Sequence, residues 1–268
     1  MVATDLARPA AERSGWRSAA VPSEHGGWGL TAEPILLGLV VAWSVAGMAL
    51  GLAAIAAFLM RTPLKLVAVD LRRGRRLDRT RLAMRIAAIE LIVLAATALS
   101  AVELGGWRWC VPVLIAAPLV AVELSFEVRS RGRRLVPELC GTVGIAATVA
   151  AIALADHRSA RLAAALWLVL AARSLGAIPF VRVQIVRMRR GAGPVRHSDL
   201  AQVASVAIAA VAVVVDRRLA LGSIAVAVLA VAQSVWVRRA PIPARRLGLR
   251  QMALGLALVA VSAVGVLW

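Results

Sequence analysis

Long apolar stretches alternate with short polar stretches rich in arginine along nearly the whole chain. Each apolar stretch is close to the ~20 residues that an α-helix needs to cross about 30 Å of hydrocarbon. Helices are the expected element, because a backbone inside lipid must satisfy its own hydrogen bonds. The pattern therefore predicts an all-α bundle of about nine transmembrane helices, over residues 30–48, 49–69, 83–103, 109–126, 137–155, 161–181, 199–215, 219–236 and 248–267.

The boundary between the first two stretches is the least marked, because Ala46, Gly47 and Met48 carry no charge. A single helix over residues 30–60 would be about 45 Å long, which is more than the membrane core accommodates. We therefore expect a helical hairpin in this region.

The arginines between the apolar stretches predict the side of the membrane on which each loop lies. The loops after the second, fourth, sixth and eighth stretches contain Arg72, Arg73, Arg75, Arg76, Arg79 and Arg81; Arg129, Arg131, Arg133 and Arg134; Arg182, Arg187, Arg189, Arg190 and Arg196; and Arg238, Arg239, Arg245, Arg246 and Arg250. Cytoplasmic loops of membrane proteins carry an excess of positive residues. We therefore expect a multi-pass protein of the cell membrane with a cytoplasmic N-terminus and an extracytoplasmic C-terminus.

The same pattern predicts how the chain divides into domains. Residues 1–28 are polar and lack the apolar core of a signal peptide, so we expect a cytoplasmic N-terminal segment. Residues 29–268 contain no long linker and are expected to form one transmembrane domain.

Composition excludes a water-soluble fold and argues against nucleic acid as a partner. Hydrophobic residues make up 61% of the 268 positions, well above the ~45–50% of soluble domains, and the mean hydropathy is +0.82. The net charge of +18 would suit nucleic acid only if the basic residues shared one surface, whereas here they are divided among loops. Membrane lipids are the expected surroundings. No metal-binding or cofactor-binding motif is present, so neither a metal nor a cofactor is predicted.

Two arginines fall inside predicted membrane spans, where a charge requires a reason. Arg61 and Arg173 each lie about 18 Å from the outer end of their helix, toward the cytoplasmic side. Each is followed by a proline that frees backbone groups, and Lys65 and Arg182 continue the two cationic faces toward the cytoplasm.

Acidic residues occur at a similar depth, which suggests a polar cavity open to the cytoplasm. The predicted ligand-binding residues are Arg61, Lys65, Arg173, Arg182, Glu33, Glu90 and Glu138. The planar guanidinium fork suits a phosphate or carboxylate, so an anionic lipid or another phosphate-bearing ligand is the expected occupant. Two other interpretations stay open: the charges form buried ion pairs that fix helix packing, or the arginines extend to the lipid headgroups.

His25 is the candidate catalytic residue, although a lone histidine is more often structural. It lies in Ser23-Glu24-His25-Gly26-Gly27-Trp28-Gly29, immediately before the first apolar stretch. The glycines permit close approach of another backbone or of a ligand. Glu24 could orient the ring of the histidine.

Four segments resemble the YwiC-like family of bacterial membrane proteins, which would place the chain in a bacterial inner membrane. They are Pro22 to Gly29, Arg61-Thr62-Pro63-Leu64, Glu138-Leu139-Cys140-Gly141, and the stretch from Arg173 to Arg182. The nine-helix layout is also similar to the UbiA superfamily of intramembrane prenyltransferases. That resemblance implies aspartate-rich motifs that hold Mg²⁺ and a prenyl diphosphate. At the corresponding places this chain has Arg61 and Arg173, and an arginine side chain can bind an anion directly, without a metal.

Three function hypotheses follow from these observations. The first is binding or transport of an anionic or amphipathic small molecule. The second is a UbiA-like enzyme that acts on an isoprenoid or lipid substrate, and the third is a structural or assembly partner of a membrane complex. The sequence predicts no oligomeric state.

Overall fold

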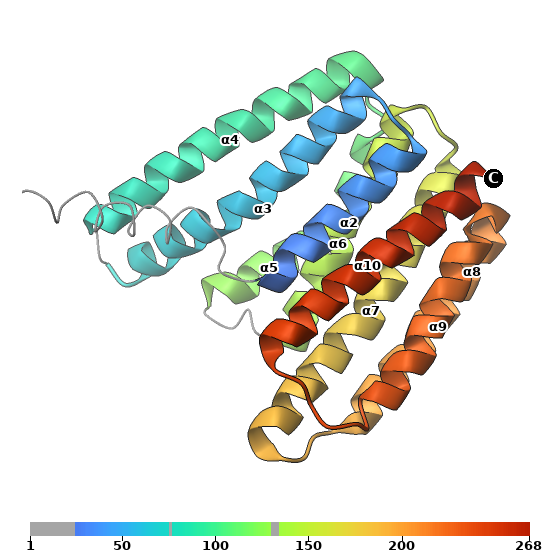
Figure 1. The fold of residues 1–268 in the computed structure, drawn as a ribbon. Helices are drawn as coiled ribbons and strands as arrows, with labels where there is room; N and C mark the ends of the chain where they lie inside the picture. The colour runs from blue at the N-terminus through green and yellow to red at the C-terminus, as the bar shows by residue number, and fades with distance from the viewer. Residues whose placement is uncertain (1–24, 75–76, 130–133) are drawn as a thin grey trace, which may run out of the picture.

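The computed structural model describes residues 25–74, 77–129 and 134–268, and the described part of the chain is helical throughout, without a strand (Figure 1). The helices are α2 (His25–Val41), α3 (Val45–Arg72), α4 (Asp78–Gly105), α5 (Cys110–Val128), α6 (Leu135–Ala155), α7 (Ala160–Arg190), α8 (Val195–Val215), the 3₁₀ helix η1 (Arg217–Leu219), α9 (Ala220–Trp236) and α10 (Ala244–Leu267).

Eight helical segments of the described chain are long and apolar enough to cross a membrane. The described part of α2, 17 residues from His25 to Val41, is also apolar. The prediction of an all-α, multi-pass membrane bundle is therefore confirmed. The chain is a membrane protein, while the side on which each terminus lies stays a prediction.

The predicted hairpin between the first two helices is present, but its turn comes earlier than expected. α2 ends at Val41, and α3 begins at Val45. The Ser44 hydroxyl accepts a hydrogen bond from the backbone N–H of Gly47 at 3.0 Å, which satisfies one free donor of the first turn of α3. Hydropathy alone could not locate this turn, because the residues on both sides of it are apolar.

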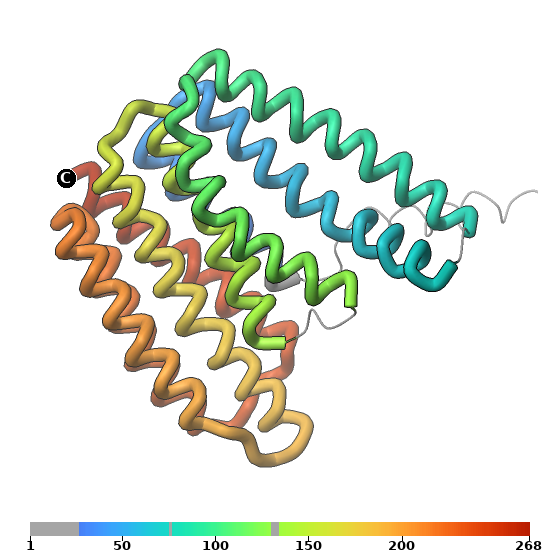
Figure 2. Tube along the Cα trace, turned by 180° about the vertical axis from the view of Figure 1, so that it is seen from behind, coloured from blue at the N-terminus to red at the C-terminus, as the bar shows by residue number. Residues whose placement is uncertain are grey.

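The centre of the bundle is formed by α6 and α7, the two most deeply buried helices. Both helices contribute buried small residues to the core, such as Ala150 and Ala153 of α6 and Ala165 and Ala172 of α7, and small residues let helices approach closely. α8, α9 and α10 pack on one side of this pair, and α2 lies between α6 and α10 (Figure 2).

The α3–α4 hairpin leans away from the remaining helices (Figures 1 and 2). The end of the hairpin formed by the start of α3 and the last residue of α4 is held close to the bundle. There Gly105 lies against Ala46 and the Ala155 carbonyl, so that a Cβ added to Gly105 would be only 2.9 Å from that oxygen. Toward the other end α4 diverges from α5. Both helices are fully described, and no Cα of α4 comes within 8 Å of a Cα of α5.

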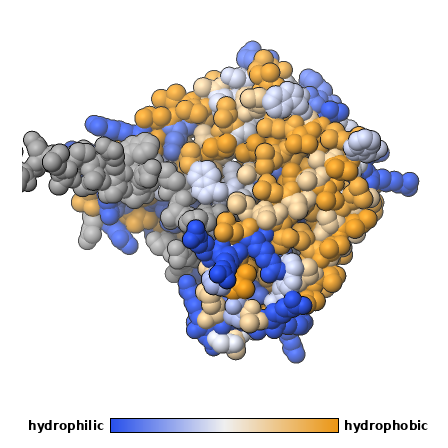
Figure 3. All heavy atoms as spheres, in the orientation of Figure 1, coloured by the Kyte–Doolittle hydropathy of each residue, from blue (hydrophilic) through white to orange (hydrophobic). Residues whose placement is uncertain are grey.

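Successive long helices run in opposite directions, so the arginine-rich loops gather at one end of the bundle and the C-terminus lies at the other (Figure 1). The flank between the ends is largely hydrophobic, and hydrophilic side chains gather toward the arginine-rich end (Figure 3). Contacts join these loops: Arg72 Nη1 donates to the Val128 carbonyl at 2.8 Å, and Arg187 Nη1 donates to the carbonyls of Val237 and Arg239.

Candidate functional site

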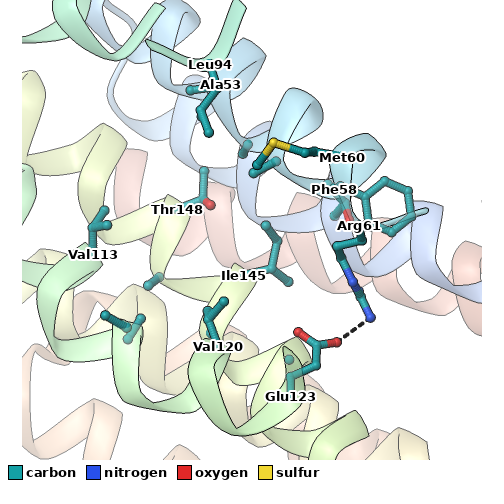
Figure 4. A pocket seen from close by; sticks show the side chains of 18 of the residues that line it. Ala53, Phe58, Met60, Arg61, Leu94, Val113, Val120, Glu123, Ile145 and Thr148 are labelled. Atoms are coloured by element: carbon teal, nitrogen blue, oxygen red, sulfur yellow. Dashed lines mark ion pairs between the residues drawn. The ribbon is translucent and has the colours of Figure 1, made fainter. Parts of the chain in front are cut away.

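A cavity of about 590 Å³ lies among α2, α3, α4, α5 and α6, and its wall is almost entirely apolar (Figure 4). Its volume falls within the ~300–1,000 Å³ range of small-molecule pockets. The side chains that define it in Figure 4 are Ala53, Phe58, Met60, Leu94, Val113, Val120, Ile145 and Thr148. The cavity lies on the side of α6 where the α3–α4 hairpin diverges from α5.

One end of the cavity carries an ion cluster, and the charged residues of the lining are Arg61 and Glu123. The Arg61 guanidinium points at the Glu123 carboxylate and pairs with it (Figure 4). Arg61 Nη2 also donates to Glu127 Oε1 at 3.0 Å, and Lys65 Nζ lies 3.9 Å from the same oxygen. Two cations therefore face two carboxylates at the arginine-rich end of the bundle.

A glycine on α6 makes room for this cluster. The Glu123 carboxylate lies directly against Gly141, at the position that a Cβ on residue 141 would occupy. The motif that contains Gly141 was apparent from the sequence, but its partner on α5 was not. Contacts between helices, even consecutive ones, cannot be read from local spacing.

The cavity also contains an unsatisfied hydrogen-bond donor. Trp109, at the start of α5, lines the wall and is only 8% exposed. Within the described chain, its indole Nε1 is buried without a hydrogen-bond partner. Because Arg61 and Trp109 come from opposite ends of the α3–α5 region, polar groups occur at both ends of a largely apolar space.

Arg173 and Glu33 lie in a second cluster, which is separate from the cavity. Arg173 is 3% exposed; its Nη2 donates to the Gln251 carbonyl at 2.8 Å and lies 4.0 Å from Glu33 Oε1. Gly255 on α10 accommodates the Glu33 carboxylate in the same way that Gly141 accommodates Glu123. The two membrane-embedded arginines thus reach different acids on different sides of the bundle.

Buried glutamines extend this second cluster across the C-terminal helices. Gln202 Nε2 donates to the Gly176 carbonyl at 2.9 Å and to Gln233 Oε1 at 3.0 Å. Gln233 Nε2 lies 3.5 Å from Gln251 Oε1. Such a network fixes the register of α7, α8, α9 and α10, since buried polar groups require partners. These glutamines are not distinguished in the sequence, because uncharged polar residues stand out little within an apolar stretch.

The remaining predicted residues occupy three other places. Arg182 Nη1 donates to Glu138 Oε2 at 2.8 Å and so joins α7 to the start of α6. Glu90 lies half-buried on α4, and one of its carboxylate oxygens has no hydrogen-bond partner among the described residues. His25 opens α2, but its side chain lies outside the described part of the chain, as do residues 1–24 of the predicted N-terminal segment. The structure thus distributes the predicted ligand-binding residues over several contacts, and their role in binding stays a prediction.

Comparison with known proteins yields one match. The family model for YwiC-like proteins matches residues 21–153. Over these residues the chain belongs to the YwiC-like family. No curated protein and no solved structure matches the chain, so the UbiA-like layout stays a prediction.

The YwiC-like region and the cavity coincide. Every residue that lines the cavity, from Gly27 to Ala151, falls within the matched range. The second cluster, in contrast, takes Arg173, Gln202, Gln233 and Gln251 from beyond it. In the described ranges, no three His, Cys, Asp or Glu side chains lie close enough together to hold a metal ion.

Proposed function

We propose that this YwiC-like membrane protein binds an amphipathic molecule with an anionic headgroup in the cavity among α2 to α6. The observation that carries the proposal is an apolar space of about 590 Å³ that has guanidinium and carboxylate groups at one end. An elongated apolar body suits the wall, and a headgroup suits the ion cluster.

The headgroup is expected to bind at Arg61. This side chain keeps 32% of its surface exposed although it is paired, and Lys65 beside it is 45% exposed. A guanidinium has five N–H donors and can contact a carboxylate and a phosphate together. An incoming anion would take over the contact of Arg61 with Glu127, while Glu123 stays against Gly141.

Lipid is the expected source of such a molecule. α4 and α5 do not contact each other, and Val113 of the cavity wall is substantially exposed, so we expect the cavity to open to lipid between these two helices. A molecule that is already dissolved in the bilayer would not need to cross water to enter. This supports binding of an amphiphile more than binding of a small water-soluble metabolite.

A fluorescent long-chain fatty acid provides the test, with the corresponding alcohol as an uncharged comparison. Thr148→Phe fills the cavity and should weaken binding of both probes at least about tenfold. Ser100→Phe is the matched control, because Ser100 lies on the exposed face of α4 and bonds only its own helix. Organic extracts of the purified proteins, analysed by mass spectrometry, should show an amphiphile that Thr148→Phe has lost.

A second pair of variants tests the charge requirement. Arg61→Gln combined with Glu123→Gln removes both charges of the lining without leaving either partner ionised alone. This double variant should weaken binding of the fatty acid by roughly tenfold and leave binding of the alcohol unchanged. Arg218→Gln combined with Asp216→Asn removes an ion pair outside the cavity, between residues that are not predicted to bind ligand, and should change the binding of neither probe. Equal binding of the fatty acid to all four variants would refute the proposal.

A further inference from the structure

A groove on the opposite side of the bundle has the features of a separate lipid site. It lies between α8 and α9, close to the arginine-rich end, and has a volume of about 760 Å³. Its lining consists of Gln202, Val203, Val206, Ala230, Val231, Ser234, Val235, Arg238 and Arg239. The four valines are substantially exposed along the groove, so an apolar chain could cover them.

The rim of the groove is held in place by hydrogen bonds. Arg238 binds Asp199 of α8 in a bidentate manner, at 3.0 and 2.8 Å, and these bonds raise the pKa of Arg238. The carbonyl of Arg239 accepts a bond from Arg187 of α7 at 2.9 Å. Gln202 is held from behind by Gly176 and Gln233. The backbone of the rim is therefore positioned before any ligand arrives.

Arg239 is the cation that this arrangement leaves available. Its side chain is exposed, and none of the described residues forms an ion pair or hydrogen bond with it. The guanidinium of Arg250 of α10 stacks over the ring of Trp236, three residues before Arg239, at 3.2 Å from the centroid. Arg250 therefore adds a second positive charge on this side of the bundle, which favours an anion.

We infer that the α8–α9 groove binds an anionic phospholipid of the surrounding bilayer. The phosphate contacts Arg239 at the membrane surface, and an acyl chain lies along the valines. Val231 lies in α9, five residues or about 7.5 Å before the end of the helix at Trp236, and Arg239 follows three residues beyond that end, so the charged and apolar contacts have the order that a lipid requires. The site shares no residue with the cavity of the proposed function and does not depend on it.

Native mass spectrometry of the full chain tests the inference, with phosphatidylglycerol and phosphatidylcholine of the same acyl composition as probes. Phosphatidylglycerol should bind preferentially. Arg239→Gln should weaken binding of phosphatidylglycerol about tenfold and remove the preference for it over phosphatidylcholine. Arg239→Lys should retain most of this binding and of the preference. Arg190→Gln, an exposed arginine at the same end of the bundle, is the matched control and should have no effect.

The apolar part of the groove is tested separately. Val231→Trp should exclude the acyl chain and weaken both lipids, whereas Val214→Trp, on an exposed position of α8 outside the groove, should not. Thr148→Phe leaves the groove intact and should not change the part of phosphatidylglycerol binding that Arg239→Gln removes, so failure here is distinguishable from failure of the cavity proposal. The inference is overturned if Arg239→Gln binds like Arg190→Gln. It is also overturned if inorganic phosphate displaces the lipid completely, or if Val231→Trp changes the oligomeric state instead of lipid binding.

Discussion

At the scale of single residues, two glycines determine where membrane-embedded acids can lie. Gly141 faces Glu123, and Gly255 faces Glu33, in each case from a neighbouring helix. A carboxylate that lies against a glycine backbone can reach an arginine on a third element, here Arg61 or Arg173. The absence of a side chain at these positions is therefore part of each ion cluster.

We expect Gly255→Ala to destabilise the protein by about 1–3 kcal/mol, because its Cβ would overlap the Glu33 carboxylate and force it away from Arg173. Gly248→Ala is the control on the same helix. An added Cβ there meets no atom within 4 Å and should stabilise α10 by roughly 0.5–1 kcal/mol. Thermal unfolding in detergent measures both effects. Similar shifts for the two variants would contradict the assignment of Gly255.

Asp216, in the loop between α8 and α9, should make stability depend on pH. Hydrogen bonds from the Arg218 side chain, at 2.7 and 3.0 Å, are the main cause that lowers the pKa of Asp216 below its usual value. A lowered pKa in the folded state stabilises the protein above the unfolded pKa of about 3.9, and this contribution is lost as the pH falls through the folded value. Asp216→Asn should therefore reduce the loss of thermal stability below about pH 4. Arg217→Gln should keep the wild-type profile, and an unchanged profile in Asp216→Asn would rule out this role.

At the scale of elements, the α3–α4 hairpin is held by a buried acid at its tip. Both oxygens of Asp70 accept from Arg79, at 2.8 and 3.2 Å, and Thr80 donates to the same carboxylate at 2.7 Å. Asp70 is 1% exposed. These bonds fix the start of α4 relative to the end of α3.

Asp70→Asn should loosen the tip of the hairpin, since an amide cannot accept both bonds from Arg79. We expect faster trypsin cleavage at Arg72 and Arg73 and faster hydrogen exchange at the start of α4, with little change in α7. Asp78→Asn, whose side chain is fully exposed, serves as the control. If the two variants are cleaved at the same rate, Asp70 does not hold the hairpin.

The number and approximate position of these helices could be predicted from the sequence, because hydropathy over about 20 residues reflects the solvent that each helix meets. Pairings between helices could not. Arg61 and Arg173 stand at equal depth and appear equivalent in the sequence, yet one meets Glu123 and Glu127 and the other meets Glu33 and Gln251. Which acid each arginine reaches depends on the order of helices around the bundle, and short-range patterns contain no information about that order.

At the scale of the whole molecule, the chain combines two regions with different interiors. The YwiC-like region encloses an apolar cavity, while α7 to α10 are joined by buried glutamines and serines such as Ser205, which donates to the Ala172 carbonyl at 2.7 Å. We expect the first region to accommodate changes in packing when a ligand binds, and the second to remain rigid as its support.

The orientation of the bundle can be tested with single cysteines in a chain that carries Cys110→Ser and Cys140→Ser. Ala192→Cys and Ala240→Cys lie in exposed arginine-rich loops and should react with a membrane-impermeant maleimide only from the cytoplasm. Trp107→Cys and Trp268→Cys, both strongly exposed at the other end, should react only from outside. Labelling of Ala192→Cys and Trp268→Cys from the same side would invalidate the predicted topology. Labelling of Ala192→Cys only from outside, and of Trp268→Cys only from the cytoplasm, would reverse it.

The unequal lengths of α3 and α5 have a consequence for the lipid around the protein. The 19 residues of α5 extend about 28 Å, slightly less than the ~30 Å of an average hydrocarbon core, whereas the 28 residues of α3 extend about 42 Å. Hydrophobic mismatch of this kind is relieved when the bilayer thins beside the short helix and the long one tilts. We therefore expect ligand occupancy of the cavity, which borders both helices, to vary with the acyl-chain length of the host membrane.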